Sequence, residues 1–130
     1  MEDGDFLRKA NVVAVVGVSI DPAKWGYKLY NALKPVYSRV YAVNPRYGKV
    51  DGVRCYPDLR SLPEKPDVVV TVVPPKVTEA VVEVCRDLGI RRIWMQPGSE
   101  SEKAIDLCRS NGIEVIYNCC LVVDGLGGGF

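Results

Sequence analysis

The sequence predicts a single α/β domain in which helices cover both faces of a doubly wound, mainly parallel sheet, in three layers. Two continuous apolar runs, over 12–16 and 68–73, are typical of strands that are buried on both faces. Helix-like segments alternate with the strand candidates along the chain, as parallel sheets require. At 130 residues, with 48% hydrophobic and 25% charged residues, the chain has the size and composition of one globular domain.

The first half of the chain contains two further strand candidates. After the strand over 12–16, a helix is predicted over about 25–34, because its apolar residues gather on one side. Residues 39–43 alternate in polarity and predict the second strand. A short extended piece over 53–56 predicts an edge strand, and a turn of helix follows it.

The second half repeats the alternation. The strand over 68–73 is followed by a helix over 76–88, whose apolar residues recur every three or four positions. A strand is predicted over 92–95, and Ser99 with Glu102 has the spacing of a capping box that begins the next helix. With a last strand over 114–117, these elements predict a Rossmann-like fold.

The domain is expected to have its core over 11–123 and flexible ends at 1–10 and 124–130, since the tail is rich in glycine. The charged N-terminus lacks the apolar segment of a signal peptide, and no apolar run is long enough to cross a bilayer. We therefore expect a cytoplasmic protein that does not bind membranes. A net charge of +1 gives no electrostatic footprint for nucleic acid.

The chain contains no histidine, which excludes histidine-based triads, phosphohistidine chemistry and the commonest metal ligand. Its five cysteines are scattered without a C-x-x-C pair, so no zinc site is indicated. No residue is therefore predicted to be catalytic or to bind a metal.

Five loops are predicted to gather at one edge of the sheet, because the carboxyl ends of parallel strands share an edge. In such folds ligands bind outside these ends, where the strand order reverses. The candidate loops cover residues 17–24, 44–49, 73–76, 96–99 and 118–120.

The first loop begins with Gly17-Val18-Ser19. A glycine lets the backbone turn tightly and approach a ligand, and Ser19 offers a hydroxyl and an amide close to a helix start. Lys24 adds a positive charge suited to phosphate. We interpret this loop as a phosphate site; a plain strand-to-helix turn is the alternative.

The second loop, Asn44-Pro45-Arg46, argues against an NAD site. Such sites place an acidic residue here to bind the ribose, and the first loop also lacks the G-x-G-x-x-G pattern. Arg46 instead suits a ribose phosphate, as found in NADP or at the 3′ position of coenzyme A. The alternative for Arg46 is an exposed charge in a turn.

The third and fourth loops are predicted to line the same site. Val73, Pro74 and Pro75 form an apolar wall suited to adenine or to a pantetheine arm; equally, the prolines begin a helix. Gln96 and Gly98 present amide groups to the ligand or merely form a turn.

The fifth loop contains Asn118-Cys119-Cys120 after the last strand. A thiol there needs a neighbouring base or cation to act as a nucleophile, and the chain has no histidine to serve as that base. We expect these cysteines to pack in the interior or to line the end of a thioester pocket.

Together these motifs make the chain resemble the CoA-binding domain family, which is similar to the N-terminal domain of the succinyl-CoA synthetase alpha subunit. The resemblance covers nearly all of residues 11–123. The motifs that carry it are G-V-S-I-D-P-A-K-W-G (17–26), V-N-P-R (43–46), G-V-R-C-Y-P-D-L (52–59), P-D-V-V-V-T-V-V-P-P (66–75) and W-M-Q-P-G-S-E-S-E (94–102).

The resemblance implies coenzyme A as the ligand and a role for each loop. The first loop would hold the phosphates through its glycine, serine and lysine, and residues 44–46 would flank the adenosine. Residues 73–75 would pack on the nucleotide and the pantetheine arm, with Gln96 and Gly98 along the arm. Asn118-Cys119 would lie near the thiol.

The synthetase carries its phosphohistidine in a further domain that this chain lacks, so its reaction is not implied. We therefore expect a stand-alone protein that binds CoA or acyl-CoA as a carrier, sensor or regulatory subunit without its own catalysis. A thioester-handling enzyme subunit that needs a partner, or an NADP-binding reductase, is the alternative. Besides the small molecule, a homodimer through the edge strand near Cys55 or an unknown protein partner is conceivable.

Overall fold

The computed structural model describes residues 3–128, and seven strands within this range form one sheet in the order β3-β4-β2-β1-β5-β6-β7. All neighbouring strands run parallel except β3, which is antiparallel to β4. The strands are β1 (Val12–Val16), β2 (Arg39–Val43), β3 (Lys49–Val50), β4 (Val53–Tyr56), β5 (Val68–Thr71), β6 (Arg92–Met95) and β7 (Glu114–Ile116).

The centre of the sheet is built from the two valine-rich strands. β1 pairs with β2 on one side and with β5 on the other, and the valines of β5 are almost completely buried. The chain runs outward from β1 through β2 to β4, then returns to β5 and continues outward through β6 to β7. The strand order therefore reverses between β1 and β5, which confirms the predicted doubly wound, Rossmann-like sheet.

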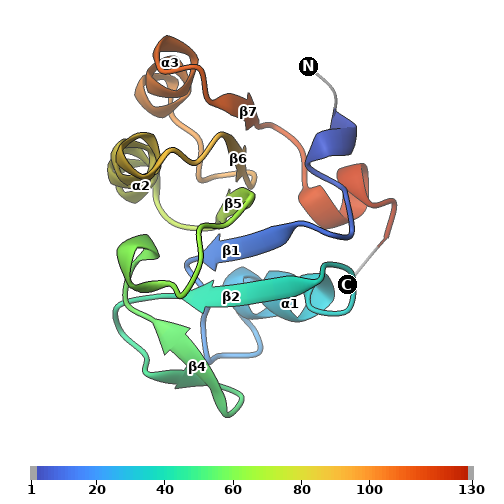
Figure 1. The fold of residues 1–130 in the computed structure, drawn as a ribbon. Helices are drawn as coiled ribbons and strands as arrows, with labels where there is room; N and C mark the ends of the chain where they lie inside the picture. The colour runs from blue at the N-terminus through green and yellow to red at the C-terminus, as the bar shows by residue number, and fades with distance from the viewer. Residues whose placement is uncertain (1–2, 129–130) are drawn as a thin grey trace.

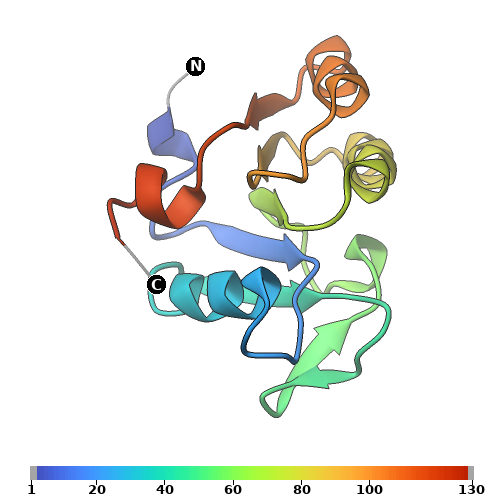
Figure 2. The same cartoon turned by 180° about the vertical axis from the view of Figure 1, so that it is seen from behind.

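Helices cover both faces of this sheet (Figures 1 and 2). One face carries α1 (Trp25–Leu33), together with the short helical segments η1 (Asp3–Asp5) and η3 (Leu121–Gly125). The other face carries α2 (Pro75–Leu88), α3 (Glu102–Ser110) and the turn η2 (Leu59–Ser61). Two apolar cores lie between these layers and the sheet, so the three-layer architecture is also confirmed. No helix in the described range is long and apolar enough to span a membrane.

The prediction of an edge strand over 53–56 is wrong, because β3 covers β4 within the same chain. Asp51 and Gly52 join the two strands, and both have positive φ angles (51° and 79°), as a two-residue type I′ hairpin turn requires. Cys55 is consequently only 4% exposed and lies inside the sheet. The strand that contains Cys55 is therefore not an open edge for a second copy.

The predicted capping box is also wrong. The amino end of α3 is capped by Ser101, whose hydroxyl accepts a hydrogen bond from the backbone N–H of Ala104 at 3.0 Å. The Ser99 hydroxyl instead lies 2.9 Å from the hydroxyl of Thr71, at the end of β5. This tertiary contact outweighs the local capping pattern.

The segments on both sides of the predicted core pack against it where the structure describes them. Phe6 is fully buried and packs edge to face on Trp94, with the ring centres 5.9 Å apart. At the other end, Val122 is buried and Leu126 packs against the same core. Residues 1–2 and 129–130 lie outside the described range.

A candidate ligand site at the carboxyl edge of the sheet

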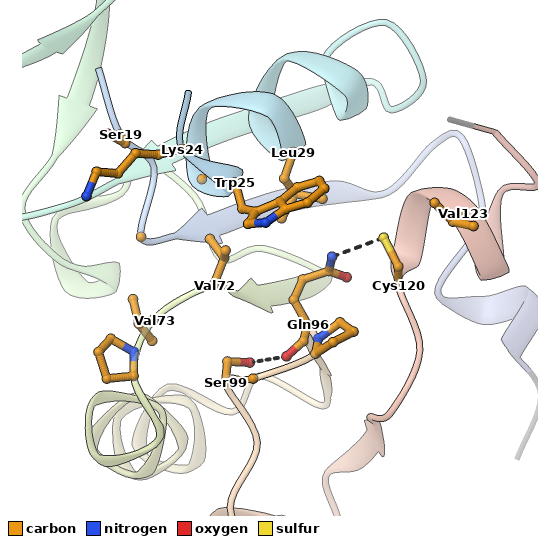
Figure 3. Close-up of a pocket in the computed structure, with 15 residues that line it drawn as sticks. Ser19, Lys24, Trp25, Leu29, Val72, Val73, Gln96, Ser99, Cys120 and Val123 are labelled. Atoms are coloured by element: carbon orange, nitrogen blue, oxygen red, sulfur yellow. Dashed lines mark hydrogen bonds between the residues drawn. The ribbon is translucent and has the colours of Figure 1, made fainter. Parts of the chain in front are cut away.

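A pocket of about 630 Å³ lies at the carboxyl ends of β1, β5 and β6, beside the point where the strand order reverses (Figure 3). Its volume is within the usual range for small-molecule sites. The lining comes from four segments: Gly17, Ser19, Lys24, Trp25, Gly26 and Leu29 after β1; Val72, Val73 and Pro74 after β5; Gln96, Pro97, Gly98 and Ser99 after β6; and Cys120 and Val123 near the C-terminus.

Two glycines bring the β1 loop close to its neighbours. Gly17 has a φ of 107°, and a Cβ atom there would lie 2.5 Å from the carbonyl oxygen of Val72. Gly26, in the first turn of α1, packs so closely on the Gly17 carbonyl that any Cβ would overlap the oxygen. Side chains are therefore excluded at both positions, so backbone atoms line this part of the pocket.

The loop between these glycines is held by its own hydrogen bonds. The Ser19 hydroxyl accepts from the backbone N–H of Asp21 at 3.0 Å, and the Asp21 carboxylate accepts from that of Ala23 at 2.9 Å. Lys24 follows with an exposed side chain, and no side chain in the described range caps the amino end of α1. The loop thus combines one cation, Lys24, with an uncapped amino end of a helix, a combination suited to an anion.

The predicted residues of the β2 loop do not line the pocket. The Asn44 amide donates to the Val18 carbonyl at 2.9 Å, and its oxygen accepts from the backbone N–H of Arg46 at the same distance. Asn44 therefore joins the β1 and β2 loops, and Pro45 and Arg46 are exposed beyond it. Val18 points into the core and is fully buried, so its side chain does not face the site.

Of the two adjacent prolines, one lines the pocket and the other begins a helix, so each alternative interpretation holds for one of them. Val73 and Pro74 line the pocket, as the apolar-wall interpretation predicts. Pro75 is the first residue of α2 and does not line it. Its missing N–H costs nothing at that helix position.

The far wall of the pocket is organised by Gln96. Its side chain is 7% exposed; the amide oxygen accepts from the backbone N–H of Leu121 at 2.8 Å, and the amide nitrogen lies 3.3 Å from the sulfur of Cys120. These two contacts attach η3 to the end of β6. Gly98 also lines the pocket, and its N–H donates to the carboxylate of Glu100 at 2.9 Å.

Cys120, rather than Cys119, lies at the pocket (Figure 3). The backbone carbonyl of Cys119 accepts a hydrogen bond from the indole N–H of Trp94 at 2.9 Å. Asn118 is exposed and has a positive φ of 63°, so it serves the turn after β7. Neither Asn118 nor Cys119 lines the pocket.

Seven of the fifteen lining residues were singled out as site residues from the sequence, and three more, Pro97, Ser99 and Cys120, lie in loops that were named as candidates. Five lining residues lie outside the candidate loops: Trp25, Gly26, Leu29, Val72 and Val123. Trp25 directly follows Lys24 and Val72 directly precedes Val73, so extending each loop by one residue would have found these two.

The fold and the pocket define a small ligand-binding domain of the Rossmann-like class. The model of the CoA binding domain family matches residues 11–125, so this chain belongs to that family. A solved structure of a conserved hypothetical protein from Pyrococcus furiosus is 37% identical, with a TM-score of 0.79. That match covers 85% of this chain and 95% of the other, so a protein of nearly the same extent has the same fold.

The curated relatives include much longer enzymes. ADP-forming acetate–CoA ligase I from Archaeoglobus fulgidus is 29% identical over 120 residues, which cover 85% of this chain and 18% of the ligase. The alpha subunit of ADP-forming acetate–CoA ligase II from Pyrococcus furiosus is 27% identical over 128 residues, covering 90% of this chain and 28% of the subunit. The chain thus spans less than a third of these ligases and is related to their CoA-binding part.

Proposed function

We propose that this chain binds coenzyme A or a short acyl-CoA in the pocket at the β1–β5 edge and acts as a carrier, sensor or regulatory subunit. The observation that carries the proposal is the pocket itself. At one end it has the loop over 17–26, called the anion loop below, and beyond this loop it has apolar walls. Membership of the CoA binding domain family supports CoA as the ligand.

The chemistry of the surroundings suggests how CoA is held. Its phosphates would bind at Ser19 and Lys24, where backbone groups and a positive charge meet. The adenosine would extend along the surface toward the β2 loop, where Arg46 suits the 3′-phosphate. The pantetheine arm would then enter the pocket.

A first test is calorimetric titration with CoA, acetyl-CoA and NADPH. CoA or acetyl-CoA is expected to bind with one site per chain, and NADPH is not. Binding of NADPH without binding of CoA would reject the proposal in favour of a reductase.

Substitutions of the two cations test the placement of the phosphates. Lys24→Ala and Arg46→Ala should each weaken CoA binding by about 1–3 kcal/mol if each contacts a phosphate. Lys103→Ala is a matched control, since Lys103 is an exposed cation of α3 that does not line the pocket. Unchanged affinity in both site variants would refute this orientation of the ligand.

A subunit of a thioester-handling enzyme is the second candidate, because relatives include an alpha subunit of an acetate–CoA ligase. The chain has no histidine to act as a base or to carry a phosphoryl group. We therefore expect no release of free thiol from acetyl-CoA by this chain alone. Thiol release that is lost in Cys120→Ser would show that the chain catalyses hydrolysis.

The cysteines give an independent measurement of ligand binding. Burial raises the pKa of Cys108 to about 12 and also raises the pKa of Cys85, so both remain protonated and unreactive near pH 8. Cys120 opens on the pocket, and iodoacetamide is expected to modify it in the native protein. Saturating CoA should slow this modification several-fold, as measured by peptide mass spectrometry.

The sign of the pH effect follows from the direction of these shifts. A raised pKa keeps Cys85 and Cys108 protonated as the pH rises past the usual range of a thiol, so their alkylation should require unfolding. Modification of either residue in native protein at pH 8 would contradict the burial. Modification of Cys120 at the same rate with and without CoA would argue against a ligand at the far wall.

A further inference from the structure

Trp25 is unusual for a tryptophan, because 62% of the residue is exposed at the start of α1. Large aromatic side chains normally bury most of their surface. The other tryptophan, Trp94, follows this rule with 1% exposure. The ammonium group of Lys28 lies 5.1 Å from the centre of the Trp25 ring, which places a cation near the indole.

The exposed indole forms part of the pocket. In Figure 3, Trp25 projects from α1 over the space between Val72 and Gln96, with Leu29 behind it. Ser19 and Lys24 lie toward one end of this view, and Cys120 lies toward the opposite end. The indole is therefore placed between the anion loop and the far wall.

This middle part of the pocket is apolar. Apart from the indole N–H of Trp25 and the amide of Gln96, which is already hydrogen bonded to η3, its side chains offer carbon surface. The residues that supply this surface are Trp25, Leu29, Val72 and Pro97. An uncharged segment of a ligand fits this part of the pocket.

We propose that the Trp25 indole is the surface against which the pantetheine arm of CoA packs, so that Trp25 determines the preference for CoA over nucleotides that lack this arm. The inference rests on the proposed function and adds a residue and a specificity to it. Packing against the arm buries part of the exposed surface of Trp25, which favours binding.

The order of the strands in the sheet favours the arm over the adenine ring as the group at Trp25. The β2 loop, with Arg46, lies on one side of β1, whereas β5 and β6, which carry the apolar walls, lie on the other side. A CoA molecule whose phosphates occupy the β1 loop extends in both directions. The phosphate-bearing ribose fits the side with the cation, and the uncharged arm fits the side with Trp25.

The first test compares CoA with adenosine 3′,5′-bisphosphate, which has the nucleotide end but no arm. By calorimetry, Trp25→Ala is expected to weaken CoA binding about ten-fold and to change binding of the bisphosphate by less than about two-fold. Trp25→Phe, which keeps an aromatic surface, should lose much less affinity for CoA. Val53→Ala, which removes an exposed apolar side chain outside the pocket, is the matched control.

The second test does not depend on tight binding. The chain has two tryptophans, so its indole N–H region holds two NMR signals, and the signal missing from Trp25→Phe belongs to Trp25. Millimolar pantetheine alone is expected to shift the Trp25 signal and to leave that of Trp94 in place, whereas adenosine 3′,5′-bisphosphate shifts neither.

The outcomes separate this inference from the proposed function. If the unaltered chain binds no CoA, the proposed function fails before any variant is compared. If it binds CoA but Trp25→Ala leaves the affinity unchanged, or weakens both ligands equally, the role of Trp25 is refuted and CoA binding stands. A shift of the Trp25 signal by the bisphosphate and not by pantetheine would place the adenine at the indole instead.

Discussion

Gly26→Ala is expected to weaken CoA binding more than ten-fold and to lower the free energy of unfolding by about 3 kcal/mol. In an ordinary helix this substitution stabilises, by about 1 kcal/mol. Here the added methyl group would overlap the carbonyl oxygen of Gly17, and both partners belong to backbone that cannot rotate away. The β1 loop must therefore move away from α1, which distorts the anion site and the helix start together.

Urea denaturation and calorimetry measure the two effects of this substitution. Gly48→Ala is the control, because a Cβ at Gly48 meets no atom within 4 Å and its backbone needs no positive φ. It should change the stability by less than about 0.5 kcal/mol and leave CoA binding intact. A Gly26→Ala protein with normal stability and affinity would show that the loop and the helix are not in close contact.

Phe6→Ala is expected to destabilise the protein by about 3–5 kcal/mol, the range for removing a fully buried phenylalanine. Phe6 has no exposed surface and packs edge to face on Trp94. Its carbonyl oxygen also accepts the hydroxyl of Tyr37 at 3.0 Å and the amide of Asn11 at 3.3 Å. The residue thus joins the N-terminal segment to β1 and to the end of the α1 layer.

Denaturant unfolding monitored by circular dichroism tests this prediction. Tyr37→Phe removes the hydrogen bond to Phe6 and keeps the ring, so its cost should be nearer 1 kcal/mol. If Phe6→Ala costs no more than Tyr37→Phe, the N-terminal segment does not belong to the core.

The central elements were predictable because their signals are local and agree with one another. The valines of β1 and β5 form continuous apolar runs, and strands of this kind are stable only between two covering layers. The helix α2 has both a regular apolar spacing and Gly89 at its end, which adopts the left-handed conformation that terminates helices. The apolar spacing and the terminating glycine therefore predict the same helix.

Two errors have different causes. The hairpin of β3 and β4 carries the Asp-Gly pair typical of type I′ turns, so its signal was present in the sequence and was missed. Ser99 satisfies the capping pattern, and only its contact with Thr71, 28 positions away in the chain, shows that it does not cap α3. No local pattern contains that contact.

The candidate site was predictable on one side only. The loops after β1, β5 and β6 were found because parallel strands bring their carboxyl ends to one edge. The loop with Cys120 was also placed at this edge, but Val123 of η3 was missed, because the glycine-rich tail suggested a loose segment. Its attachment depends on Gln96 and the backbone of Leu121, which are 25 positions apart.

Trp94, in β6, contacts residues from both the N-terminal segment and the C-terminal segment. Its ring packs on Phe6, its N–H holds the carbonyl of Cys119, and a methyl group at Gly125 would lie 2.9 Å from it. Packing of the segments around Phe6 and Gly125 on Trp94 is thus linked to the position of Cys120 at the pocket. The coupling is reciprocal. A ligand whose binding requires Cys120 in this position stabilises the packing of Phe6 on Trp94, and a substitution that disrupts that packing lowers the affinity for the ligand by the same factor.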